Sequence, residues 1–144
     1  MIVVDASVAL SWVLPDTEAN HRYSATVAEA GLTGRKRLIV PLVFHAECSY
    51  VLLKRGRAGR WGDALIGEYA ELIDWFSLET HVVVQDIAPQ VRFAARYNVQ
   101  GYDALYLSLA METGAALATV DGGLKTAARI AGVELFQADA IKRP

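Results

Sequence analysis

Four acidic residues are the strongest candidates for chemistry in this sequence: Asp5, Glu47, Asp103 and Asp121. Carboxylates that met at one place would repel one another, and a divalent cation would relieve that repulsion. A set of oxygen ligands suits Mg2+ or Mn2+. Mg2+ held by few carboxylates keeps bound waters, and one or two such ions can activate a water to attack a phosphate. The four residue types therefore favour metal-assisted chemistry on phosphate esters, provided that the fold brings them together.

Two of the acids directly follow predicted strands. Asp5 comes after Ile2–Val4, and Asp121 comes after Ala116–Val120. Because an open parallel sheet binds ligands outside the carboxyl ends of its strands, both side chains are expected at that rim. Each also has a plainer explanation. Asp5 could cap the helix that follows it, and Asp121, which precedes two glycines, could be a turn residue.

The other two acids lie on predicted helices. Asp103 falls in the first turn of Tyr102–Glu112, and a helix that crosses over between parallel strands begins at their carboxyl rim. In the plainer explanation, Asp103 only interacts favourably with the helix dipole. Glu47 lies about 8 Å along its helix from Leu42, at a rise of 1.5 Å per residue. Acids from four separate segments can thus meet at one edge if the strand order allows it.

Glu47 is the most informative of the four because its helical neighbours are apolar. None of the residues three and four positions away on this face is a Lys or Arg that could pair with it: Val43, Phe44, Tyr50 and Val51. An unpaired carboxylate on such a face is costly unless it binds a metal. We therefore expect Glu47 to bind a ligand such as a metal ion, and not only to be part of the core.

Short apolar runs alternate with longer amphipathic segments along the chain. The predicted strands are Ile2–Val4, Leu38–Val40, Val82–Val84, Ala116–Val120 and Val133–Phe136. The predicted helices are Ser7–Leu14, Glu18–Ala30, Leu42–Arg55, Trp61–Phe76, Ile87–Tyr97, Tyr102–Glu112 and Leu124–Ala131. Helices are expected to end at Gly31, Gly56, Gly114 and Gly132. The alternation predicts an α/β fold, a three-layer α/β/α sandwich around a mostly parallel sheet of about five strands.

The composition fits one folded domain spanning residues 1–144, with 53% hydrophobic residues and a net charge of -2. A nucleic acid would have to be bound through local basic patches or metal ions, because the overall electrostatic field of a protein with this net charge would not attract it. The one cysteine, Cys48, excludes an intramolecular disulfide and a cysteine-rich zinc site. The N-terminus lacks a signal-peptide pattern, and no apolar run is long enough to span a bilayer, so we expect a cytoplasmic protein.

Four stretches, VVDASVALSWVLPD, HAECSYVLLKR, GYDALYLSLA and LATVDGGLKTAA, together resemble the PIN-domain family, and closely the VapC toxins of bacterial toxin–antitoxin pairs. The resemblance covers nearly the whole chain. It matches the family's four acids to Asp5, Glu47, Asp103 and Asp121. It also matches Ser7 and Thr119 to hydroxyl positions that support the site.

The resemblance implies Mg2+- or Mn2+-dependent cleavage of RNA, inhibition by a cognate VapB-like antitoxin, and a homodimer. The apolar segment around Trp12 is expected either to form part of the antitoxin groove, as short early helices do in relatives, or to be ordinary core. The chain departs from the family at Gly122–Gly123, where relatives often carry further polar or acidic residues. This departure leaves four acids and puts a second, firmly held metal in doubt.

Basic residues near two predicted helix ends are candidates for contact with RNA phosphates. Lys125 and Arg129 follow Asp121 at helical spacing. A second group lies around a two-glycine turn and could equally be a solvated loop: Lys54, Arg55, Arg57 and Arg60. The three histidines lie on different elements, and none is assigned a role.

Other classes of protein share the strand–helix alternation. A receiver-type phosphoacceptor domain would need an acidic pair after its first strand, where VVDAS has one acid. A haloacid-dehalogenase phosphatase would need a second Asp where Ser7 stands. A catalytically idle PIN fold used only for binding is the third alternative, and the four intact acids argue against it.

Overall fold

The computed structural model describes residues 1–137, and its centre is a sheet of four parallel strands. The strands are β1 (Ile2–Val4), β2 (Leu38–Pro41), β3 (Glu79–His81) and β4 (Ala116–Ala118). Their order across the sheet is β3-β2-β1-β4, so β1 lies between β2 and β4. Val3 pairs with Ile39 on one side and with Leu117 on the other. The first and last strands of the chain are therefore direct neighbours.

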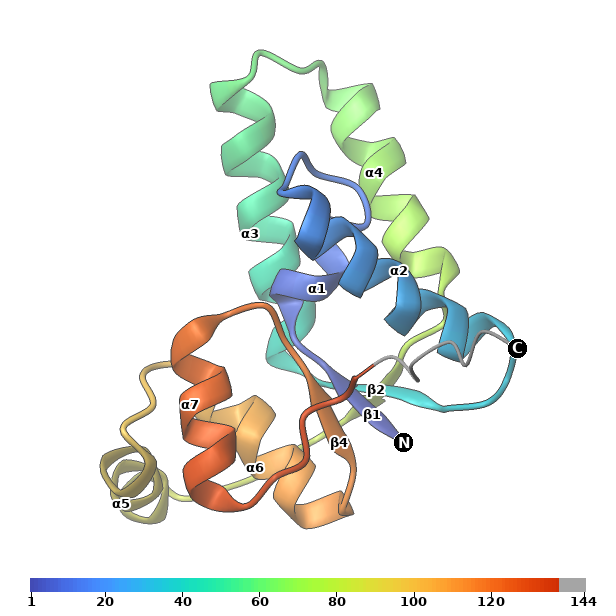
Figure 1. Cartoon of the computed structure of the whole chain (residues 1–144). Coiled ribbons are helices and arrows are strands. Elements are labelled where there is room, and N and C mark those ends of the chain that lie inside the picture. The colour runs from blue at the N-terminus through green and yellow to red at the C-terminus, as the bar shows by residue number, and fades with distance from the viewer. Residues whose placement is uncertain (138–144) are drawn as a thin grey trace, which may run out of the picture.

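Seven helices surround this sheet in the described part of the chain (Figure 1). They are α1 (Ala6–Ser11), α2 (Glu18–Leu32), α3 (Val43–Ala58), α4 (Asp63–Trp75), α5 (Ile87–Tyr97), α6 (Asp103–Thr113) and α7 (Gly122–Ala131). Helix α6 packs against β1, β2 and β4, with α5 and α7 beside it. Helices α1 to α4 lie together on the other side, where α3 and α4 form a long hairpin. The three-layer α/β/α arrangement is confirmed.

Helices cover both faces of the central strands. This explains why β1 and β2 are apolar throughout and do not alternate between apolar and polar residues. Every residue of β1 and β2 is buried. Parallel strands covered by helices on both faces have this pattern because neither face meets water. None of the described helices is both long enough and apolar enough to cross a membrane.

The prediction of a strand at Val82–Val84 was wrong. The third strand is Glu79–His81, and it pairs with β2 from Ile39 to Pro41. β2 ends at Pro41 and α3 begins two residues later, so the backbone of Val82–Val84 has no partner strand to continue the pairing. The β-branched residues favoured a strand by propensity, but position in the sheet decides the outcome. Val82 and Val84 are exposed instead.

The sheet has four strands, not five, because Val133–Phe136 does not form a strand. This segment makes a single bridge, between Leu135 and Leu117. Leu117 donates a hydrogen bond of 2.8 Å to Glu134 O and accepts one of 2.8 Å from the Phe136 backbone. The segment therefore touches the edge of β4 without extending the sheet. β4 itself ends at Ala118, earlier than expected.

Glycine has two different uses in the helices. Gly114 and Gly132 end α6 and α7 with positive φ angles of 69° and 71°, as predicted. Gly31 and Gly56 were wrongly expected to end helices, since α2 continues to Leu32 and α3 to Ala58. A Cβ on Gly56 would lie 2.5 Å from the Ile66 side chain, so this glycine lets α3 and α4 approach closely. Helix α1 is shorter than expected and ends at Ser11.

Candidate functional site

Asp5 is the buried centre of the candidate site, with 4% of its surface exposed. It directly follows β1, and its carboxylate Oδ2 accepts two hydrogen bonds, at 2.6 Å from the Ser7 hydroxyl and at 2.8 Å from the Thr119 hydroxyl. Asp5 occupies the N-cap position of α1, but its side chain makes no capping hydrogen bond. Helix capping is therefore not what holds this carboxylate in place.

The two hydroxyls join the ends of β1 and β4 in the same way. Ser7 Oγ accepts a hydrogen bond of 3.3 Å from the Val120 backbone N–H. Thr119 Oγ1 accepts one of 3.0 Å from the Asp121 backbone N–H. Each hydroxyl thus donates a hydrogen bond to Asp5 and accepts one from a backbone N–H of the segment that follows β4. Ser7 and Thr119 lie where the sequence placed them, as neighbours of the first acid.

The pKa of Asp5 is raised above its ordinary value. Burial is the main cause, because it disfavours the charged form. The Ser7 and Thr119 hydroxyls oppose the rise by stabilising the carboxylate, whereas the negative charge of Asp121 adds to it. Asp5 therefore lies in a position where an additional positive charge would be favourable.

Asp121 is exposed and has the capping role that the plainer explanation gave it. It is the N-cap of α7, and its Oδ2 accepts a hydrogen bond of 2.8 Å from the Leu124 backbone N–H. Helix α7 begins at Gly122, two residues before the predicted start, so both glycines are helical. A capping bond uses one carboxylate oxygen and fixes the side chain at the rim beside Asp5.

Asp103 lies in the first turn of α6, as predicted, and is half-buried. Burial raises the pKa of Asp103 to about 6, and the charges of Asp5 and Asp121 add to the shift. Asp103 is therefore near enough to Asp5 and Asp121 for their charges to act on it. Asp103 is the first residue of α6, after the N-cap residue Tyr102, whose side chain makes no capping hydrogen bond.

Glu47 lies on the second turn of α3 and is half-buried. Burial raises the pKa of Glu47, the nearby Tyr106 hydroxyl opposes the rise, and the charges of Asp5 and Asp103 add to it. Its Oε1 atom is buried and makes no hydrogen bond with any described residue. A buried carboxylate oxygen without a donor is the feature expected of a ligand-binding acid and not of a structural one.

The structure thus brings the four acids into one electrostatically coupled neighbourhood. The charge of Asp5 acts on Glu47 and Asp103, and the charge of Asp121 acts on Asp5 and Asp103. Within residues 1–137, no three His, Cys, Asp or Glu side chains already converge as ligands of one ion. Coordination by several of these acids would therefore need side-chain rotation. The all-oxygen donor set and the absence of a Lys or Arg salt bridge to any of the four acids among the described residues fit Mg2+ or Mn2+.

Tyr106 is a part of this neighbourhood that the sequence reasoning missed. It lies on α6, one turn after Asp103, and is fully buried. Its pKa is raised far above the usual range, mainly by burial and then by the charge of Glu47. The spacing of three residues from Asp103 could have indicated it, because residues three apart share a helix face.

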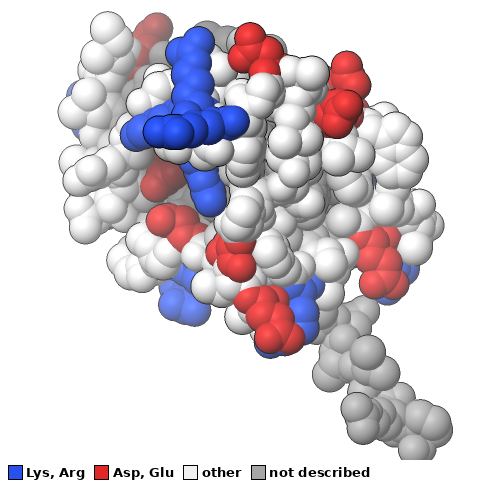
Figure 2. All heavy atoms as spheres, turned by 90° about the horizontal axis from the view of Figure 1, so that it is seen from above, with Lys and Arg blue, Asp and Glu red and all other residues white. Residues whose placement is uncertain are grey.

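The predicted basic residues fall into two groups. Lys125 and Arg129 lie on α7, one and two turns beyond Asp121, with Lys125 half-buried and Arg129 exposed. Lys54, Arg55 and Arg57 are exposed in the last turns of α3, at the end of the α3–α4 hairpin, where Figure 2 shows basic side chains gathered.

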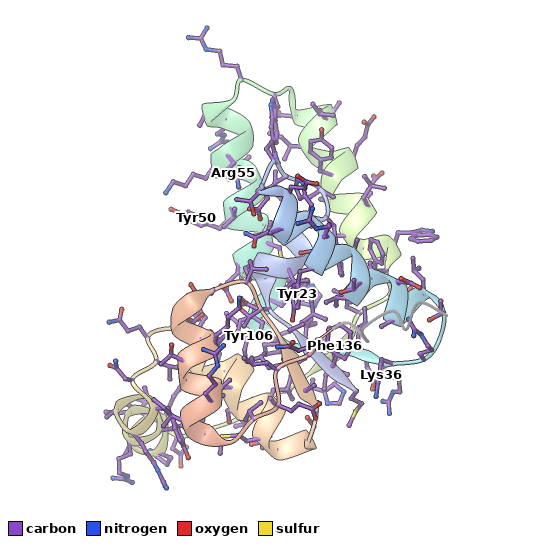
Figure 3. All side chains as sticks on the ribbon, viewed as in Figure 1. Tyr23, Lys36, Tyr50, Arg55, Tyr106 and Phe136 are labelled. Atoms are coloured by element: carbon purple, nitrogen blue, oxygen red, sulfur yellow. The ribbon has the colours of Figure 1, made fainter. Side chains whose placement is uncertain are left out.

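Arg55, labelled in Figure 3, is the member of this second group that turns toward the body of the molecule, where it lines a hollow together with Ser7 and Val120. One Arg55 nitrogen donates a hydrogen bond of 3.2 Å to Pro15 O. Arg57 lies ten residues after Glu47, about 15 Å along the helix at 1.5 Å per residue. Arg57 is thus remote from the acids, whereas Arg55 and Lys125 lie nearer to them.

Comparisons with known proteins bear on the same region. A family model described as the PIN domain matches residues 2–130, a range that includes all four acids. The crystal structure of PAE2754 from Pyrobaculum aerophilum is similar to this chain, with a TM-score of 0.63 and 20% sequence identity. The match covers 91% of this chain and 89% of that one, and at this identity it concerns the fold. Among curated proteins, the comparison found no significant match.

Proposed function

Because this chain belongs to the PIN-domain family, whose members are generally metal-dependent nucleases, we propose that it is a Mg2+- or Mn2+-dependent endoribonuclease that hydrolyses RNA phosphodiester bonds. The observation that carries the proposal is the environment of Asp5. This carboxylate is buried at the carboxyl end of β1 and accepts hydrogen bonds from the Ser7 and Thr119 hydroxyls. Its negative charge also acts on Asp103 and Glu47. No salt bridge to any of these acids is found among the described residues.

The four acids would hold the metal: Asp5, Glu47, Asp103 and Asp121. A divalent ion there would supply an activated water and charge stabilisation for the leaving oxygen. The chain's own contribution is orientation. Ser7 and Thr119 both bond Oδ2 of Asp5, so its other oxygen is left without a side-chain partner among the described residues. Leu124 fixes Asp121 in the same manner through its backbone N–H.

Lys125 and Arg129 are proposed to contact the RNA backbone near the cleaved bond. Both lie on the helix that Asp121 caps, and phosphate contacts need only local positive charge in a chain of net charge -2. Arg55, which lines a hollow with Ser7 and Val120, would contact a phosphate near the acids, and Lys54 and Arg57 would contact phosphates farther along a bound strand. Their position at the end of the α3–α4 hairpin suits a longer substrate and not the reaction itself.

We further propose that the chain is the toxin of a VapBC-type pair and that a VapB-like antitoxin occupies an apolar groove between α1, α2 and α4. This groove has a volume of about 620 Å3 and is lined in part by Trp12, Leu14, Trp61 and Leu72. Trp12 is half-buried, so it contributes both to the core and to the groove wall. An amphipathic segment of a partner could bury its apolar face there.

The proposal includes a homodimer, supported by an apolar surface on the opposite side of the fold. Helix α5 has no buried residue, and Ile87 and Val91 are 82% and 61% exposed. Val84, just before the helix, is 83% exposed. Large apolar side chains grouped at this exposure are typical of a surface that another protein covers.

The experiment that tests the activity is cleavage of single-stranded RNA by the purified chain with Mg2+, with Mn2+ and with excess chelator. We expect cleavage with either ion and none in chelator. The matched control is the Asp5→Asn variant prepared in the same way, which excludes a contaminating nuclease. Equal cleavage in excess chelator would remove the metal mechanism.

A further inference from the structure

Two buried polar atoms beside the acids have no hydrogen-bond partner among the described residues: Oε1 of Glu47 and the hydroxyl oxygen of Tyr106. Burying a polar atom without a partner costs free energy, so such atoms are rare and call for an explanation. Here the two atoms are complementary. A carboxylate can only accept hydrogen bonds, and a protonated tyrosine hydroxyl can donate one.

The two side chains come from helices in different layers of the fold. Glu47 projects from α3, and Tyr106 projects from α6, where it is fully buried. Burial raises the pKa of Glu47, and Tyr106 is the one described residue whose hydroxyl opposes that rise. The hydroxyl is therefore close enough to stabilise the carboxylate, although the contact falls short of a well-formed hydrogen bond.

The neighbours of the pair offer no substitute for Tyr106. Tyr50, one turn after Glu47 on α3, is 65% exposed and projects outward (Figure 3). The same figure shows Tyr106 inside the molecule. The other oxygen of Glu47, Oε2, makes no hydrogen bond with a described residue and is not fully buried. The carboxylate thus has one fully buried oxygen and one that is partly accessible.

We propose that Tyr106 is a positioning residue that donates a hydrogen bond to Oε1 of Glu47 and so directs Oε2 toward the metal. The inference rests on the proposed function, because it concerns the same site. Hydrogen bonds at such sites are often long in the free protein and shorten when the ligand binds. A metal would hold Glu47 in its charged form, and a hydrogen bond to a charged acceptor is stronger than one to a neutral acceptor.

The test is Mn2+ binding measured by isothermal titration calorimetry on the full chain without RNA. Tyr106→Phe removes only the hydroxyl, so the ring still fills its place in the core. We expect the dissociation constant for Mn2+ to rise 10- to 100-fold, the usual effect of losing a partner that orients a metal ligand. The matched control is Tyr97→Phe, a half-buried tyrosine on α5 that packs on Phe93. It should bind Mn2+ like the wild type.

A second measurement separates positioning from a general loss of structure. Tyr106→Phe is introduced into Glu47→Ala, and binding is measured at higher Mn2+ concentration. If Tyr106 acts through Glu47, the second substitution should change the affinity less than twofold. If the losses of Mn2+ affinity caused by the two substitutions add up in the double variant, Tyr106 does not act through Glu47. That result, or a Tyr106→Phe protein with wild-type affinity, would overturn the positioning role of Tyr106 but not the metal site. A wild type that binds no Mn2+ would overturn the proposed metal site as well.

Discussion

Thr119 donates a hydrogen bond of 2.8 Å to Asp5, from a residue 114 positions later in the chain. The same hydroxyl accepts the backbone N–H of Asp121 at 3.0 Å. One side chain therefore connects two of the four candidate acids and fixes the spacing between the ends of β1 and β4.

Thr119→Val should destabilise the protein and reduce cleavage. Valine keeps the shape but removes the hydroxyl, so Asp5 loses a donor and the Asp121 backbone N–H loses its acceptor. We expect a loss of about 1 to 3 kcal/mol in the free energy of unfolding, measured by urea denaturation. Thr126→Val is the control, because that hydroxyl is exposed and bonds only the Gly122 carbonyl in its own helix. Equal effects of the two substitutions would show that the Asp5 contact is unimportant.

Asp5→Asn and Asp103→Asn should each abolish RNA cleavage while the fold stays intact. Asparagine keeps the shape of the side chain but removes the charge that a metal ligand needs. Circular dichroism and the melting temperature report the fold, and Asp63→Asn at the exposed start of α4 is the control. Retention of more than about a tenth of the rate, which corresponds to about 1.4 kcal/mol, would mean that the substituted residue is not essential.

Glu47→Gln should have opposite effects on stability with and without metal. In chelator the variant should melt at a higher temperature than the wild type, because one of several mutually repelling, half-buried charges is gone. The wild type should gain about 2.7 kcal/mol when Mn2+ is present at a hundredfold excess over its dissociation constant. The variant should lose most of that gain. Two results together would show that Glu47 is a structural residue. The melting temperature of the wild type would not change with Mn2+, and the variant would be less stable than the wild type in chelator.

The raised pKa of Asp103 predicts how the stability of the metal-free protein depends on pH. Its pKa is about 6 in the folded chain, above the ordinary value of 3.8, so the folded state binds the proton more tightly than the unfolded state. Stability in chelator should therefore rise as the pH falls from 7 toward 4. Asp5 and Glu47, whose pKa values are also raised, act in the same direction.

The Asp103 contribution is isolated by comparison with Asp103→Asn. Melting curves of the variant in chelator should lose part of the slope between pH 6 and 4 that the wild type shows. Mn2+ affinity should fall over the same range in the wild type, because protons compete with the ion for the carboxylate. Parallel stability curves for the two proteins would mean that Asp103 titrates normally.

Much of the site follows from local sequence, because the acids are tied to elements that sequence defines well. Asp5 and Asp121 follow apolar runs that form strands, and Asp103 opens a helix. What could not be predicted depends on contacts between distant segments. The backbone pairing with β2 makes Glu79–His81 a strand although all three side chains lie at the surface or partly so.

Tyr106 and Gly56 illustrate the same limit. Nothing local to Tyr106 says that its hydroxyl faces Glu47 on another helix. Gly56 has the usual signature of a helix end, but the close approach of Ile66 gives it a packing role inside the last turn of α3. For both residues, the role is determined by a residue on another helix, Glu47 for Tyr106 and Ile66 for Gly56, and not by the neighbouring sequence.

The pairing of the first strand with the last also has a consequence during synthesis. Asp5 leaves the ribosome well before Thr119, which is made 114 residues later. A nascent chain that stops before β4 contains Asp5, Glu47 and Asp103 but has neither the neighbouring strand nor the second hydroxyl for Asp5. Translation products truncated before β4 therefore cannot build the complete set of contacts around Asp5, and the candidate site forms only after Thr119 has been made.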